Sequence, residues 1–136
     1  MAKVSIKGII VGTLVTLLLD IVGGIALMFA LGGASLFELP AEEQSAGIDA
    51  FSLSTPYLTI GMVIGLLTTV FGGYLAARIA KREAYLNSGL LGAVGIVIGL
   101  AFASGFPVWF NAVAFLLTVP AALLGGHLAK RTYSNA

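Results

Sequence analysis

The sequence predicts an all-α integral membrane protein, a four-helix bundle that forms a single transmembrane domain over residues 1–136, and two observations support this expectation. Of its 136 residues, 59% are hydrophobic and only 10% are charged, and the mean hydropathy is +1.06, whereas a soluble domain keeps about a quarter of its residues charged. The few charges also leave three long stretches almost free of them. This composition excludes soluble enzymes and nucleic-acid-binding proteins.

Four membrane-spanning helices are expected, because a helix crosses the bilayer core with about 20 apolar residues. The first charge-free stretch, residues 8–37, is interrupted only by Asp20, and the second covers residues 50–77. The third, residues 84–129, is too long for one crossing, and it breaks before Pro107 because a residue that precedes proline avoids helical dihedral angles. The expected helices cover residues 8–31, 57–79, 88–103 and 108–129.

The first stretch has an alternative interpretation as a secretory signal peptide, because Lys3 and Lys7 precede its apolar residues. A signal peptide has an apolar region of about 7–15 residues. The run here is longer, so we expect the segment to be retained as the first helix.

The charges predict how the chain lies in the membrane. The outer loop, residues 34–55, carries four acidic residues and no basic one, and Pro40 within it predicts the start of a short helix. Because short basic loops stay in the cytoplasm, both termini are expected to be cytoplasmic in a multi-pass protein of the bacterial inner (cytoplasmic) membrane. All basic residues lie at one set of helix ends: Lys3, Lys7, Arg78, Lys81, Arg82, Lys130 and Arg131.

The second and fourth expected helices end in the same pattern, Gly-Gly-x-Leu-Ala-x-Arg, at residues 72–78 and 125–131. Both hairpins enter from the same side, so we expect two parallel-repeat hairpins related by a pseudo-twofold axis along the membrane normal. Through this motif the chain resembles a loose group of small, uncharacterised four-helix bacterial inner-membrane proteins. The resemblance implies the membrane location and no activity.

Two better-known families share features with the first expected helix. Residues 7–12 and Leu19-Asp20 are similar to the first helix of the GtrA-like flippase-associated proteins, whose Asn and Arg-Trp signature in the second helix has no counterpart here. Asp20 also resembles the single acidic residue in the first helix of the small multidrug exporters, whose aromatic pattern in helices 2 and 3 is missing. Neither resemblance transfers a function.

Small residues recur at helical spacing and predict where helices pack. Lipid provides little hydrophobic force between helices, so their association depends on close approach of backbones, which small residues permit. The long row in the second helix also predicts a homo-oligomer or contacts with other membrane proteins, in addition to membrane lipids. The glycines expected at these packing faces are Gly61, Gly65, Gly73, Gly95 and Gly99.

Asp20 is the one acidic residue inside an expected span, near the middle of the bilayer, where an ionised carboxyl group is costly and marks a candidate site. One hypothesis is a protonated Asp20 that hydrogen-bonds a threonine and sets the register of two helices. The other is a proton or cation site. Pro120 predicts a kink in the last helix at a similar depth. The candidate polar site consists of Asp20, Thr16, Thr68, Thr69 and Thr118.

The remaining residues predict no enzyme activity. The chain has no cysteine, no nucleophile with a base and an orienting group at usable spacing, and no cluster that suggests a metal or cofactor. The preferred hypothesis is a small non-catalytic membrane protein that acts as a subunit, assembly factor or scaffold. The alternative is a small proton- or cation-coupled transporter or channel that uses Asp20.

Overall fold

The computed structural model describes residues 3–134, and all regular structure in this range is helical. Four of the helices are long and apolar enough to cross a membrane, which confirms the four expected spans. Five α-helices and two short 3-10 helices make up the described chain: α1 (Ile6–Ala30), η1 (Gly33–Glu38), α2 (Ala41–Ser52), α3 (Thr55–Ala80), α4 (Ala84–Phe102), η2 (Ala103–Gly105) and α5 (Val108–Ser134).

Each spanning helix extends beyond its expected range at one end or at both. The helix expected from residue 8 begins at Ile6, because the side chain of Ser5 caps it and accepts a hydrogen bond from the amide of Gly8 at 3.0 Å. The helix expected from residue 88 begins at Ala84, and the last helix continues to Ser134 rather than 129. Hydropathy marks where a helix is apolar, whereas backbone hydrogen bonds and caps decide where it ends.

The outer loop is largely helical, and the short helix expected near Pro40 is confirmed as α2. Glu42 and Glu43 occupy its first turn, where the helix dipole favours negative charge. Gln44 ties α2 to the preceding segment, since its side-chain amide donates to the backbone carbonyls of Phe37 and Leu39 at 3.2 and 3.0 Å. The loop is therefore a folded element rather than an extended connection.

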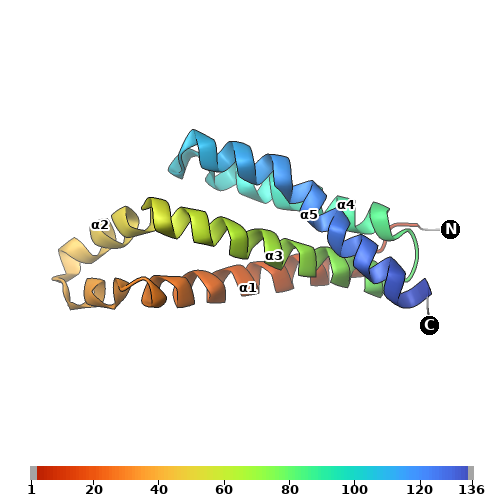
Figure 1. Ribbon diagram of the computed structural model, residues 1–136, viewed down its shortest axis with the longest axis horizontal. Coiled ribbons are helices and arrows are strands. Elements are labelled where there is room, and N and C mark those ends of the chain that lie inside the picture. The colour runs from red at the N-terminus through yellow and green to blue at the C-terminus, as the bar shows by residue number, and fades with distance from the viewer. Residues whose placement is uncertain (1–2, 135–136) are drawn as a thin grey trace.

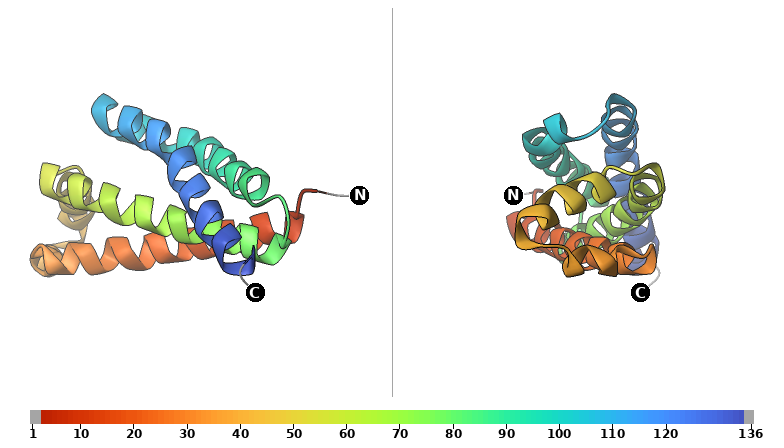
Figure 2. Two further views of the ribbon diagram at one scale, coloured as in Figure 1. Left: turned by 45° about the vertical axis from the view of Figure 1, so that its right-hand side comes forward. Right: turned by 90° about the vertical axis from the view of Figure 1, so that its left-hand side faces the viewer.

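The four long helices form two pairs that diverge from one end. In Figure 1, α1 and α3 lie side by side, and α4 lies beside α5. The pairs meet where α1 begins and α5 ends, which we call the converged end, and they separate toward α2, which we call the splayed end (Figure 2). Helix α5 contains Pro120 and bends part-way along its length (Figure 2).

Small residues allow close packing at the converged end. A Cβ atom added at Gly12 would lie 2.6 Å from the side chain of Leu91 and 2.7 Å from the carbonyl oxygen of Gly72. Leu91 is only 3% exposed there, in one apolar cluster with Ala76 and Ala122. The interior of this end therefore has no space for a further side chain.

Helices α3 and α5 cross at the converged end through reciprocal contacts. A Cβ atom at Gly73 would collide with the carbonyl group of Ala122, and a Cβ atom at Gly125 would collide with that of Val70. Gly73 thus faces the residue three positions before Gly125, and Gly125 faces the residue three positions before Gly73. Such direct backbone contact is what small residues permit between membrane helices.

A buried amide also closes the converged end. Asn87 of α4 is 0% exposed. Its side-chain oxygen accepts a hydrogen bond from the backbone amide of Ser5 at 2.6 Å, and its side-chain nitrogen lies 3.1 Å from the carbonyl of Lys3 and 3.0 Å from that of Glu83. Asn87 therefore joins the start of α4 to the segment that leads into α1.

Candidate intramembrane site at Asp20

Two adjoining cavities lie between the helix pairs, and Asp20 lines both. The first has a volume of about 250 Å³ and the second about 350 Å³. Gly61, Gly65 and Phe110 also line both cavities, so the two spaces meet at the depth of Asp20. We refer to the two together as the cleft.

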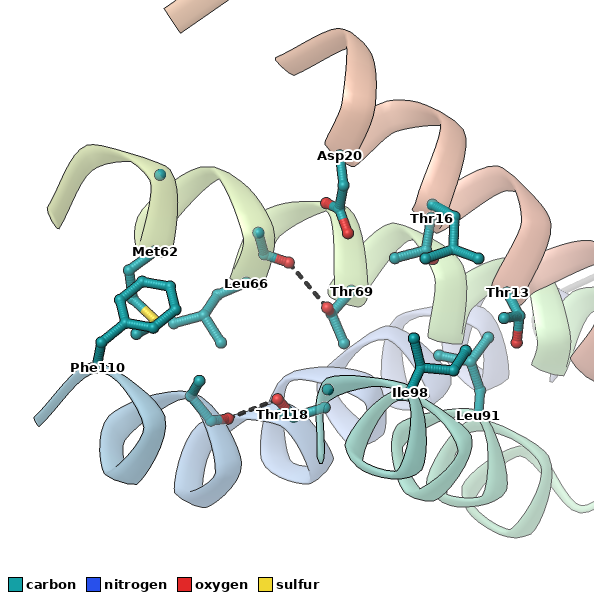
Figure 3. Close-up of a pocket in the computed structure, with 16 residues that line it drawn as sticks. Thr13, Thr16, Asp20, Met62, Leu66, Thr69, Leu91, Ile98, Phe110 and Thr118 are labelled. Atoms are coloured by element: carbon teal, nitrogen blue, oxygen red, sulfur yellow. Dashed lines mark hydrogen bonds between the residues drawn. The ribbon is translucent and has the colours of Figure 1, made fainter. Parts of the chain in front are cut away.

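Three polar residues of α1 follow one another along the first cavity. Thr13, Thr16 and Asp20 are spaced three and four positions apart, which places them on one face of a helix. Figure 3 shows these side chains in a row, with Thr69 of α3 and Thr118 of α5 across from them. The structure thus brings Thr16, Thr69 and Thr118 to the same cavity as Asp20, as the expected site required.

Thr68, the remaining expected neighbour, contacts the carboxyl group of Asp20 but does not itself line the first cavity. Its hydroxyl oxygen lies within hydrogen-bonding distance of Oδ1 of Asp20, and also 2.8 Å from the carbonyl oxygen of Gly65. A hydroxyl group has one proton to donate. It can donate to an ionised Asp20, or donate to Gly65 while it accepts from a protonated Asp20. The contact accommodates both protonation states of the carboxyl group.

The other threonines present acceptors to the cavity. Thr16 donates to the carbonyl of Gly12 at 2.8 Å, Thr69 donates to Gly65 at 2.8 Å, and Thr118 donates to Ala114. Because each hydroxyl proton is used within its own helix, the hydroxyl oxygen keeps its lone pairs for another donor. Together with Asp20, these groups favour a cation or a hydrogen-bond donor.

The second cavity leads from Asp20 toward the splayed end. It is lined by Leu27 near the end of α1, by Tyr57 and Leu58 near the start of α3, and by Phe106. The hydroxyl of Tyr57 donates to the carbonyl of Gly24 at 3.1 Å, and this hydrogen bond fixes the tyrosine ring beside the second cavity. In the opposite direction, Leu91 and the close glycine contacts end the first cavity.

The five glycines expected at packing faces have different surroundings. Gly73 faces Ala122. A Cβ atom at Gly95 would lie 3.4 Å from the side chain of Thr118, and one at Gly99 would lie 3.0 Å from that of Phe115. At Gly61 the nearest atom would be 3.7 Å away, and at Gly65 none would lie within 4 Å. Gly61 and Gly65 therefore widen the cleft within this chain.

Several residues of the site were not expected from the sequence. Thr13 is one helical step from Thr16 and Asp20, so helical spacing would have found it. The lining role of Tyr57, Phe106 and Phe110 had no such signal, because aromatic residues near span ends are common at membrane interfaces. Within residues 3–134, no three His, Cys, Asp or Glu side chains are grouped so that they could hold a metal ion.

These features define a multi-pass membrane protein with four candidate spans and a mainly apolar cleft between them that contains one carboxyl group and several threonines. A scan against protein-family models found no matching family, and searches of curated proteins and of solved structures likewise found no match.

Proposed function

We propose that this protein is a small proton- or cation-coupled transporter in which Asp20 is the group that binds and releases the coupling ion. One observation carries the proposal: Asp20 lies where the two cavities of the cleft meet. A carboxyl group whose only role was to fix the register of two helices would not need a cavity beside it, because it could fulfil that role inside a closed contact between the helices. Asp20 instead combines a threonine contact with access to a space large enough for a small solute.

The shape of the molecule supports transport by alternating exposure of the cleft. The helix pairs separate at the splayed end and are sealed by close contacts at the converged end. A transporter needs a central site that is open to one side at a time. Rocking of the α4–α5 pair against the α1–α3 pair, with a bend at Pro120, would exchange which end is closed.

The direction of opening follows from the proposed topology. All lysines and arginines of the described chain lie near the converged end, in the segment before α1, in α1, α3 and α5, and in the α3–α4 turn. Basic ends stay in the cytoplasm. We therefore propose cytoplasmic termini in the bacterial inner membrane and a cleft that opens to the outside.

The proposal is tested with the purified protein in lipid vesicles that contain a pH-sensitive dye. Under an imposed membrane potential, or with a range of small cations outside, the wild type is expected to move protons across the membrane. Asp20→Asn is expected to fold normally and to lose this flux, because only a carboxyl group can release and regain a proton. Asp20→Glu keeps that ability and is expected to retain part of the flux.

Glu83→Gln is the matched control, since Glu83 lies in the turn between α3 and α4 at the converged end and outside the cleft. It should transport like the wild type. Flux that survives in Asp20→Asn, or no flux from the wild type with any of the cations, would contradict the transporter function.

A second candidate function, a membrane subunit or scaffold, is favoured by one observation. Gly61 and Gly65 present small residues toward open space in the cleft, and such residues receive helices of other membrane proteins or of a second copy. In this function Asp20 is structural and Asp20→Asn changes neither folding nor association. Absence of flux from both wild type and variant supports this candidate over the first.

A further inference from the structure

We infer that the transported solute is an organic cation with a single positive charge, whose other end carries a hydrogen-bonding group that reaches Thr13. This inference deepens the proposed function, on which it rests. It is supported by three independent features of the cleft. These are the negative charge at its mouth and centre, the apolar character of its walls, and a hydroxyl group without a hydrogen-bond partner at its deep end.

The charges around the cleft favour a cation. The hydroxyl oxygens of Thr16, Thr69 and Thr118 face it as acceptors, and Asp20 is the carboxyl group at its centre. From residue 8 to residue 77 the sequence contains no lysine, arginine or histidine, so the splayed end is acidic. A cleft with charges of one sign at its mouth raises the local concentration of the opposite ion. A single carboxyl group inside matches one positive charge.

The walls favour an apolar body of modest size. Met62, Leu66 and Ile98 line the first cavity, and Phe110 lines both. Aromatic faces also attract a neighbouring ammonium group. The volumes of about 250 and 350 Å³ lie at the small end of ligand pockets, which hold roughly 300–1,000 Å³. A bare inorganic ion would leave these apolar walls unused.

Thr13 provides the second polar anchor. It lines the first cavity near Leu91, and its hydroxyl oxygen is buried with no hydrogen-bond partner in the part of the chain that the structure describes. Its three counterparts in the cleft all donate to a carbonyl of their own helix. A buried hydroxyl group without a partner is costly, and a bound solute that supplies the partner removes that cost.

The spacing of the two anchors sets the length of the solute. Asp20 and Thr13 are seven residues apart on α1, which corresponds to about 10 Å along the helix axis. With both side chains directed toward the solute, a cationic group and a hydroxyl or carbonyl group separated by one aromatic ring or a short chain would span them. Tyramine, with an ammonium group at one end and a phenol at the other, has this form.

The inference is tested by binding of three probes to the full chain in lipid nanodiscs, measured by calorimetry. Tyramine has both groups, phenethylamine lacks the hydroxyl, and 4-ethylphenol lacks the ammonium. The wild type is expected to bind tyramine about fivefold more tightly than phenethylamine, which corresponds to one neutral hydrogen bond. Binding of 4-ethylphenol is expected to be the weakest of the three.

Thr13→Val, which keeps the shape of the side chain, is expected to bind tyramine and phenethylamine equally, and Thr13→Ala provides a second variant if valine prevents folding. Thr13→Ser keeps the hydroxyl group and should keep the preference. Equal binding of the two amines by the wild type, a preference that survives both Thr13→Val and Thr13→Ala, tight binding of 4-ethylphenol, or no amine binding would overturn the inference. Proton flux that depends on Asp20 would leave the proposed function intact in each case.

Discussion

Replacing Gly125 with alanine is expected to cost about 2 kcal/mol of folding free energy, because the added methyl group overpacks the crossing of α3 and α5. The new Cβ atom would collide with the carbonyl group of Val70 and lie 2.6 Å from the amide nitrogen of Tyr74. Both are backbone atoms of α3, so neither can move aside by a rotamer change. The two helices must separate, which weakens the whole converged end. Unfolding by a denaturing detergent, followed by circular dichroism, measures the loss.

Gly65→Ala is the matched control for this change. Gly65 also lies within a spanning helix, but an added Cβ atom there meets no atom within 4 Å. Since alanine is intrinsically better than glycine in a helix by about 1 kcal/mol, this variant should be as stable as the wild type or more stable. Equal losses at Gly65 and Gly125 would contradict the close crossing.

Asn87→Leu is expected to cost about 2 kcal/mol or more, although leucine has the same branched arrangement of side-chain heavy atoms as asparagine and is more apolar. The substitution removes the acceptor for the amide of Ser5 and the donor to the carbonyls of Lys3 and Glu83. Unpaired polar groups in a buried setting cost about 1–3 kcal/mol each. The same detergent unfolding assay measures this effect.

Asn111→Leu serves as the comparison, because Asn111 lies at the start of α5 and is only partly buried. Its side chain donates to the carbonyls of Ala103 at 2.7 Å and Phe106 at 3.4 Å, both of which lie just before α5 in the chain. We expect less than half the loss seen at Asn87. A smaller loss at Asn87 than at Asn111 would show that the buried amide does not hold the converged end together.

The sequence predicts the spans from the length of the apolar runs, and it predicts the polar site from the depth of its residues in the membrane. An apolar run of about 20 residues has few structures available to it in a membrane, so the four spans follow directly. Residues at similar distances from the ends of neighbouring spans lie at similar depth, which is why Asp20 was expected near Thr68 and contacts it. The short helix after Pro40 follows from local turn and helix chemistry.

The shape of the cleft does not follow from the sequence in the same way. Spacing marks Gly65 and Gly125 alike as small residues on helices, but only the crossing geometry shows that Gly125 is in close contact and Gly65 faces open space. Asn87 near the end of a span resembles an ordinary interfacial residue until α4 is placed beside the start of α1. The bend of α5 and the separation of the pairs are properties of the packed helices together.

The opening of the cleft to the outside at the depth of Asp20 is tested by thiol labelling. The chain has no cysteine, so single cysteines can be introduced and treated from outside the cell with a membrane-impermeant, positively charged thiol reagent. Met62 lines the cleft, whereas its neighbour Val63 is 55% exposed on the surface that would face lipid. Ser45, exposed in α2, is the positive control.

Ser45→Cys and Met62→Cys are expected to be labelled from outside, and Val63→Cys is not, because the reagent enters the water-filled cleft and does not enter lipid. Addition of tyramine before the reagent should slow the labelling of Met62→Cys and leave that of Ser45→Cys unchanged. If Met62→Cys stays as unreactive as Val63→Cys, or if it is labelled only from the cytoplasmic side, the outward-opening cleft is contradicted.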